Sequence, residues 1–201
     1  MSNPASTICV FSSSSDAVAP HFFRAAEEVG ALLAREGMTL IYGGGKVGLM
    51  GALAGAVHRH GGRVIGVIPH YLRLKEVAYE AADELIVTKD MRERKSVMEA
   101  RADAFLSLPG GFGTLDEILE ILTLKQLQQH AKPVVFLNTE NFFGPLLDLF
   151  EHLYTHQFTK AESRQLYHVA PQPSEVFTHL QHYQLAAIGG KWFGGREDEK
   201  G

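Results

Sequence analysis

The chain has 201 residues, a formal net charge of −4 and a single cysteine, which argues against an internal disulfide, a cysteine-rich zinc site and a phosphate-binding surface for nucleic acid. Hydrophobic residues make up 45% of it and charged residues 21%, as in folded globular proteins rather than disordered chains. Without a basic leader or a run of about 18 apolar residues, we expect a soluble, cytoplasmic protein that binds neither membrane nor nucleic acid.

Short apolar runs alternate with longer stretches of helical periodicity along the chain. In the first helical stretch, Phe22, Ala26, Val29 and Leu33 recur at helical spacing, and Gly37 is a suitable stop. Continuously apolar runs such as 64–68 indicate strands that are covered on both faces. The predicted strands are 7–11, 38–42, 63–68, 84–87, 104–108, 133–137 and 166–169. The predicted helices are 21–35, 48–60, 90–102, 115–130, 142–156 and 174–184.

This repeated strand–helix–strand order predicts an α/β fold. We expect a Rossmann-like three-layer sandwich, with about seven mostly parallel strands and helices on both faces. Residues 1–188 are assigned to one domain, and residues 189–201, which are rich in glycine and charge, to a mobile C-terminal tail. Because such sheets bind ligands at the carboxyl ends of their strands, the loops that follow strands are the candidate sites.

Two glycine clusters follow predicted strands directly. The first, GGGKVG at 43–48, matches the G-x-G-x-x-G spacing of dinucleotide-binding loops. The next strand ends without an acidic residue to bind a ribose hydroxyl, and Val47 stands where a P-loop has Ser or Thr. The sequence therefore disfavours a nicotinamide cofactor and P-loop chemistry. A tight turn packed against a helix explains this cluster as well.

The second cluster, PGGFGTLDE at 109–117, predicts an anion site at the start of a helix. Thr114 stands where the N-cap of that helix belongs. Backbone N–H groups at such a helix start can bind a phosphate, with help from the helix dipole. These groups belong to Gly111, Phe112, Gly113 and Thr114. The same residues also fit a capping box, in which Glu117 reaches back to Thr114, and the two roles do not exclude each other.

A third feature is the run MRERKSVM at 91–98. In a helix, Met91, Arg94, Lys95 and Met98 fall on one face. Two cations flanked by methionines would suit a flat apolar base beside a phosphorylated sugar. Taken alone, such a run is more often a solvated basic surface.

Two histidine pairs invite a metal hypothesis. His152 and His156 are four residues apart, and His58 and His60 are two apart, but neither pair has a third ligand at a metal-binding spacing. We therefore predict no metal site. Cys9 lies inside the first apolar strand and is interpreted as a core residue.

Together, the P-G-G-x-G-T-x-x-E motif at 109–117 and the M-x-x-R-K motif at 91–95 resemble those of the Lonely guy family. Members of that family are cytokinin riboside 5′-monophosphate phosphoribohydrolases and are often labelled lysine decarboxylases. The resemblance extends over about residues 7–185 and includes the 23-residue step from Arg94 to Glu117. It implies a Rossmann-like fold that hydrolyses the N-glycosidic bond of an adenosine 5′-monophosphate, N6-substituted in cytokinin precursors. The products are free base and ribose 5-phosphate, and no cofactor or metal is required.

The resemblance also implies roles for individual residues. Arg94 and Glu117 match the catalytic pair. The expected substrate contacts are Gly44, Gly45, Glu76, Met91, Lys95, Gly111, Phe112, Gly113, Thr114, Leu115, Asp116 and Thr123. Family members are typically dimers or larger, with part of each site contributed by the partner, so we expect a homodimer.

Three alternatives compete with this interpretation. A lysine decarboxylase needs pyridoxal phosphate on a lysine, but Lys95 has an arginine beside it and matches a phosphate-binding position, so we reject that label. A nucleosidase of broader specificity remains open. A non-catalytic carrier on the same fold, similar to the molybdenum-cofactor carriers, is less favoured because it need not retain Arg94 and Glu117.

Overall fold

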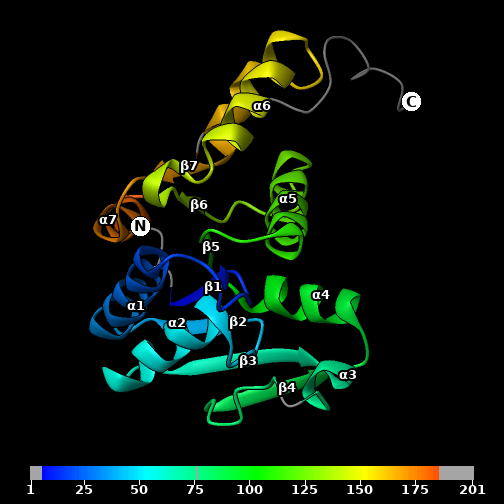
Figure 1. Ribbon diagram of the computed structural model, residues 1–201. Coiled ribbons are helices and arrows are strands. Elements are labelled where there is room, and N and C mark those ends of the chain that lie inside the picture. The colour runs from blue at the N-terminus through cyan, green and yellow to red at the C-terminus, as the bar shows by residue number, and fades with distance from the viewer. Residues whose placement is uncertain (1–5, 76, 186–201) are drawn as a thin grey trace.

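The computed structural model describes residues 6–75 and 77–185 (Figure 1). The strands within these residues form one seven-stranded sheet in the order β4-β3-β2-β1-β5-β6-β7, and every neighbouring pair is parallel. The prediction of a seven-stranded, mostly parallel sheet is therefore confirmed. The strands are β1 (Thr7–Phe11), β2 (Thr39–Tyr42), β3 (Val64–Pro69), β4 (Glu84–Thr88), β5 (Ala104–Ser107), β6 (Val134–Leu137) and β7 (His168–Ala170).

Helices cover both faces of this sheet. They are α1 (Pro20–Arg35), α2 (Gly48–Arg59), α3 (His70–Arg73), α4 (Met91–Arg101), α5 (Phe112–Gln126), α6 (Gly144–Thr155) and α7 (Pro173–Gln181), with 3-10 helices η1 (Thr139–Asn141) and η2 (Ala161–Leu166). Residues of α1, α2 and α7 share one hydrophobic core with the sheet, and residues of α4, α5 and α6 share the other (Figure 1). This arrangement is the predicted three-layer sandwich.

The central strand β1 shows why a continuously apolar run suits this position. Ile8 and Val10 pack into the core beneath α1 and α2, while Cys9 and Phe11 pack into the core beneath α4 and α5. All four are exposed by 3% or less. Successive side chains of a strand point to opposite faces, so a strand between two helical layers buries both sets.

The structure corrects the predicted start of α5. This helix begins at Phe112 with Gly111 as its N-cap, so Thr114 lies within the first turn. The N-cap prediction for Thr114 and its capping box with Glu117 are therefore wrong. Glycine is itself an acceptable N-cap residue, and Gly111 takes the extended backbone conformation that this position requires.

Other differences lie in short elements. The one-turn helix α3 was not predicted, because four residues are too few to show a helical period. Residues 161–166 form η2, so the last strand begins two residues after the predicted start, at His168. The predicted tail at 189–201 lies outside the described residues. Among the described helices, none has both the length and the apolar character needed to cross a lipid bilayer.

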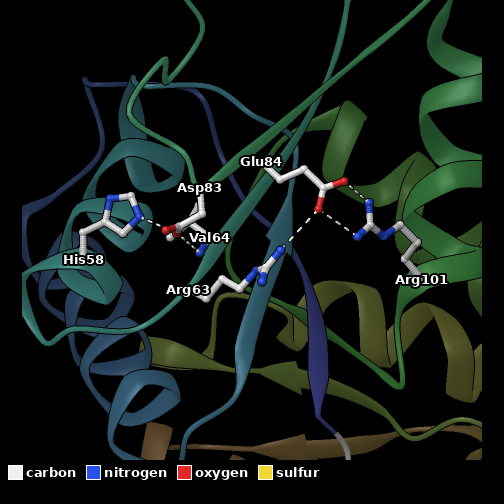
Figure 2. A network of polar contacts seen from close by, with 6 residues as sticks. All are labelled: His58, Arg63, Val64, Asp83, Glu84 and Arg101. Carbon is white, nitrogen blue, oxygen red and sulfur yellow. Dashed lines mark hydrogen bonds and ion pairs between the residues drawn. The ribbon is translucent and has the colours of Figure 1, made fainter.

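Asp83 and Glu84, at the beginning of the edge strand β4, tie it to its neighbours (Figure 2). Asp83 Oδ2 accepts a hydrogen bond from the Val64 N–H at 2.8 Å and lies 3.1 Å from Nε2 of His58 on α2. The Glu84 carboxylate lies 2.5 and 2.9 Å from the guanidinium of Arg101, at the end of α4. The contact between Glu84 and Arg101 thereby holds the edge strand β4 against α4.

The beginning of α4 is fixed by a cap. Asp90 is the N-cap residue, and its carboxylate accepts a hydrogen bond from the Glu93 N–H at 2.9 Å. Glu93 in turn accepts from the Lys89 N–H at 2.7 Å. These contacts satisfy backbone donors that the first turn leaves free. Since α4 is held at both ends, the side chains on it have a defined direction toward the sheet.

The strand order reverses between β1 and β5, the topological switch point where sheets of this kind bind ligands. Hydrogen bonds join the ends of the two strands. The Leu108 N–H donates to the Phe11 carbonyl at 2.9 Å, and the Ser13 N–H donates to the Pro109 carbonyl at 3.3 Å. The loops after β1 and β5 therefore lie side by side.

Candidate active site

A cleft of about 550 Å³ lies at the carboxyl ends of β1, β2, β3 and β5. It brings together many of the predicted site residues: Gly45, Met91, Arg94, Gly111, Phe112, Gly113, Thr114 and Glu117. The remaining lining residues are Ser12, Ser13, Ser14, Ser15, Gly43, Val47, Met50, Ile68, Leu72 and Val77. Residues far apart in the sequence meet here because the loops after four parallel strands end at the same edge of the sheet.

Arg94 on α4 and Glu117 on α5 form a buried ion pair in this cleft. Their side chains are only 8% and 9% exposed. Arg94 also donates from Nε to the Val67 carbonyl at 3.0 Å. A buried charge needs partners of this kind. The alternative of a solvated basic surface is therefore wrong for Arg94.

Gly43, at the end of β2, makes room for this arginine. A Cβ atom built at position 43 would lie 2.0 Å from Nη2 of Arg94 and 3.2 Å from Sδ of Met50. No side chain larger than hydrogen fits without displacing the guanidinium. This glycine is thus required by the packing of Arg94.

The buried position of Glu117 changes its acidity. Burial raises the pKa of Glu117, while the charge and the hydrogen bond of Arg94 act in the opposite direction. Burial, followed by the Glu117 charge, also raises the pKa of the Cys9 thiol. Cys9 is completely buried, which confirms the core role predicted for it. The geometry therefore places one carboxylate in a water-poor environment, where an electrostatic contact with a ligand is strong.

The first turn of α5 supplies an anion-binding edge. Its first intrahelical bond runs from the Leu115 N–H to the Gly111 carbonyl at 3.0 Å, so the three preceding N–H groups have no partner within the helix. Thr114 packs over Gly110, where a Cβ would lie 2.1 Å from Thr114 Oγ1. Backbone N–H groups and the helix dipole together suit a phosphate at this position.

Helix α2, which also starts at the cleft, is already capped. Its Gly48 N–H donates to Asp16 Oδ1 at 2.8 Å, and its Met50 N–H donates to the Ser13 carbonyl at 3.3 Å. These contacts use donors that an anion would need. The start of α5 is therefore the better of the two phosphate positions.

One wall of the cleft is apolar. It combines side chains from α2, β3, α3 and α4 with one from the loop before β4. These residues are Met50, Ile68, Leu72, Val77 and Met91. Met91 was predicted to contact a flat base, and its position in this wall fits that role. Methionine side chains adapt their shape to such a ring or to an alkyl substituent.

Several predicted contacts do not line the cleft. Gly44 makes a backbone contact instead, accepting a hydrogen bond from the Tyr79 N–H at 2.8 Å. Leu115 packs against the core beneath α5, and Asp116 is exposed on the outer side of that helix. Both follow from the early start of α5, because each residue turns a helix by about 100°. Thr123 lies in a separate groove, and Glu76 lies outside the described residues.

Lys95 faces a second cavity of about 420 Å³ rather than the main cleft. Its Nζ lies 3.0 Å from Asp116 Oδ2 and 2.7 Å from Glu120 Oε2. Arg94 and Lys95, which were expected on one helix face, therefore line different cavities, and Met98 is completely buried. Glu117 lines both cavities.

Sequence reasoning did not identify the loop 12–15 or, apart from Met91, the residues of the apolar wall as parts of the site. The loop 12–15, Met50 and Leu72 carried a usable signal, because they follow the carboxyl ends of β1, β2 and β3. Among residues 6–75 and 77–185, no group of three or more His, Cys, Asp or Glu side chains could hold a metal ion.

Comparisons with known proteins agree on one family. Residues 50–180 match the model of a protein family described as "possible lysine decarboxylase". A probable cytokinin riboside 5′-monophosphate phosphoribohydrolase of Oryza sativa is 40% identical over 176 residues, which cover 88% of this chain and 72% of that protein. A cytokinin riboside 5′-monophosphate phosphoribohydrolase of Arabidopsis thaliana is 40% identical over 177 residues, with 88% and 82% covered.

Solved structures share the fold. The molybdenum cofactor binding protein of Rippkaea orientalis has a TM-score of 0.68 at 25% identity, with 90% of this chain and 97% of that chain covered. The molybdenum cofactor carrier protein of Chlamydomonas reinhardtii has a TM-score of 0.67 at 23% identity, with 87% and 95% covered. The overall architecture is thus one that other proteins use for different ligands, and the residues of the cleft must decide the function.

Proposed function

This chain belongs to the Lonely guy (LOG) family of cytokinin riboside 5′-monophosphate phosphoribohydrolases, and from that premise we propose the reaction of its cleft. The protein is an N-glycosyl hydrolase that converts a cytokinin riboside 5′-monophosphate into free base and ribose 5-phosphate. The observation that carries this function is the buried Arg94–Glu117 pair, which lies in the same cleft as the free N-terminus of α5.

In the proposed complex the 5′-phosphate binds at the start of α5. The N–H groups of Phe112, Gly113 and Thr114 are free of intrahelical bonds and line or adjoin the cleft. Energy from this remote contact fixes the sugar over the reacting groups, so nucleotides should react much faster than nucleosides.

The chemistry proceeds at C1′ of the ribose. The bond to the base nitrogen breaks, its electron pair leaves with the base, and positive charge develops on the sugar in an oxocarbenium-like transition state. The ionised Glu117 carboxylate stabilises that charge and orients the water whose oxygen bonds to C1′. The water gives up one proton, and the base takes up one. Arg94 holds the carboxylate in place through its contact with Glu117 and its bond to the Val67 carbonyl.

The base is assigned to the apolar wall. Met50, Ile68, Leu72, Val77 and Met91 offer a surface suited to a purine with an alkyl group on N6. Burying such a group contributes binding energy in proportion to the apolar area removed from water.

The decarboxylase description fits the site poorly. Pyridoxal phosphate chemistry needs a lysine that forms a Schiff base with the cofactor. No lysine lines the described part of the cleft, and Lys95 is paired with Asp116 and Glu120 in the second cavity. The donor set therefore does not fit that cofactor, and we derive no step through it.

A homodimer is also proposed. Thr123 is exposed on α5, in a groove of about 330 Å³ that Leu119, Phe150 and Leu153 help to line. It cannot reach the cleft of its own chain from there, so its expected substrate contact requires a second copy. Light scattering should give the mass of at least two chains, and a stable monomer with full activity would contradict this proposal.

The reaction is tested by incubating the purified protein with AMP, N6-isopentenyl-AMP, other purine and pyrimidine monophosphates, and the matching nucleosides. Chromatography should show free base from N6-isopentenyl-AMP, and far less from its nucleoside. Release of base from most monophosphates would replace the narrow specificity with that of a broader nucleosidase. No base from any nucleotide, with tight ligand retention, would contradict the hydrolase and favour a carrier.

A further inference from the structure

We propose that Ser12 is a substrate-binding residue whose hydroxyl donates a hydrogen bond to the 5′-phosphate of the nucleotide. The inference rests on the proposed function. Ser12 follows the central strand β1, lines the main cleft and is only 9% exposed. No described residue offers its Oγ a hydrogen-bond partner.

A buried hydroxyl without a partner loses its bonds to water and gains none in return, so each such group in a folded protein needs an explanation. In the same loop, the hydroxyls of Ser13 and Ser15 have hydrogen-bond partners, and Ser14 is exposed to solvent. Ser13 Oγ accepts a hydrogen bond from the Ser15 N–H at 3.1 Å, and Ser15 Oγ accepts one from the Ala17 N–H at 3.2 Å. Thr139 has the other buried hydroxyl in the described chain that lacks a partner, and it does not line the cleft. Among the described residues, only Ser12 combines a buried, unpartnered hydroxyl with a place in the cleft wall.

The backbone around Ser12 places it beside the phosphate position. The residue before it, Phe11, accepts a hydrogen bond from the Leu108 N–H at 2.9 Å. The residue after it, Ser13, donates to the Pro109 carbonyl at 3.3 Å. Helix α5 and its anion-binding edge begin shortly after Pro109, at Phe112. Ser12 is thus attached on both sides to the strand end that leads into this edge.

A hydroxyl is a suitable donor for the phosphate. It has one proton to donate, and a hydrogen bond to a charged phosphoryl oxygen is stronger than one to a neutral acceptor. Because the flanking backbone is fixed before the ligand arrives, little freedom is lost when the bond forms. The Ser12 hydroxyl, which has no hydrogen-bond partner in the free protein, therefore gains one in the complex.

The test is calorimetric titration of ribose 5-phosphate into the wild-type protein and the Ser12→Ala variant. We expect the affinity to fall by about tenfold or more, the loss typical of a hydrogen bond to a charged group. The melting temperature of the free variant should not fall, since no bond is broken in the free protein. Ser107→Ala is the matched control, because Ser107 is completely buried on the neighbouring strand β5 and lies outside the cleft. Its affinity should equal that of the wild type.

Unchanged affinity of Ser12→Ala for ribose 5-phosphate would overturn the inference. Titration of adenosine shows which group of the nucleotide Ser12 binds. The affinity for adenosine should be the same for the wild type and Ser12→Ala. A loss of adenosine affinity equal to the loss for ribose 5-phosphate would assign Ser12 to the ribose or base instead. Should Ser12→Ala fail to fold, Ser12→Cys keeps the side chain's shape with a much weaker donor, and the same loss is expected. These titrations need no turnover. Failure of the wild type to release base would therefore count against the proposed function and not against the Ser12 contact.

Discussion

Gly43 and Arg94 approach each other so closely that a Cβ at position 43 would lie 2.0 Å from the Arg94 Nη2 atom. The guanidinium also holds Glu117, so Gly43→Ala must displace the arginine from its ion pair. Loss of this positioning should lower kcat/KM by about 100-fold, the scale expected when a catalytic group is moved by an ångström. The measurement is steady-state release of base from N6-isopentenyl-AMP.

Gly55→Ala is the control for that experiment. Gly55 lies within α2, and its Cβ would meet only the flexible end of Arg59, at 3.3 Å. Alanine favours a helix over glycine by roughly 0.5–1 kcal/mol, so this variant should be slightly more stable and fully active. An active Gly43→Ala enzyme would show that Arg94 does not need its present position.

The pH dependence of the reaction should report the burial of Glu117. Burial raises the pKa of its carboxyl above the usual range, against the opposing effect of Arg94. Since the proposed mechanism uses the ionised carboxylate, activity should be lost on acidification at a higher pH than an exposed glutamate would give. The Asp116 charge contributes to the upward shift, so Asp116→Asn should move the acid limb of kcat/KM to lower pH. A shift to higher pH would contradict this electrostatic account.

The apolar wall should determine the preference for an N6 substituent. Leu72→Ala removes apolar surface from that wall without touching Arg94 or Glu117. We expect kcat/KM for N6-isopentenyl-AMP to fall about 10-fold and that for AMP to change little, because one lost apolar contact is worth roughly 1–3 kcal/mol. Equal losses for the two substrates would place the N6 group elsewhere.

Asp83 should make stability depend on pH at the acid end. The Val64 N–H and then the His58 ring lower the pKa of the Asp83 carboxyl. Because the folded-state pKa is lowered, the ionised Asp83 carboxylate contributes fully to the free energy of unfolding above the unfolded-state pKa. That contribution is lost as the pH falls through the folded-state pKa. Because the side chain is 47% exposed, solvent screening limits the effect to about 1 kcal/mol or less.

Urea unfolding of Asp83→Asn checks this expectation. The variant should be less stable than the wild type at pH 6, and the difference should vanish near pH 2. Glu27→Gln removes only an exposed ion pair with Arg59 and should cost less than Asp83→Asn at pH 6. A constant difference for Asp83→Asn across this range would mean that the charge is not responsible.

The order of helices and strands could be predicted because both faces of the sheet are covered. Strand β1 buries side chains on each face, which leaves a continuous apolar run that no exposed strand would have. The start of α5 was predicted wrongly, since Thr114 satisfies the usual N-cap preference as well as Gly111 does. Local preference alone does not choose between two acceptable caps three residues apart.

Arg94 and Glu117 were predicted to be the catalytic pair from a resemblance that joins two distant motifs, and the structure brings these two residues together. The direction of Lys95 could not be predicted in the same way. Adjacent residues on a helix diverge by about 100°, so the rotation of α4 about its axis decides which cation enters the cleft. That rotation is set by contacts far away in the sequence, including Gly43 and Glu84.

The most direct test of the account is the kcat of Glu117→Gln with N6-isopentenyl-AMP at saturating concentration. The amide keeps the shape and can still accept a hydrogen bond from Arg94, but it has no charge to stabilise the developing oxocarbenium ion. We expect kcat to fall by about 10²–10⁴-fold, with the affinity for ribose 5-phosphate changed by no more than a few-fold. Full activity of this variant would contradict the proposed role of Glu117 and the mechanism built on it.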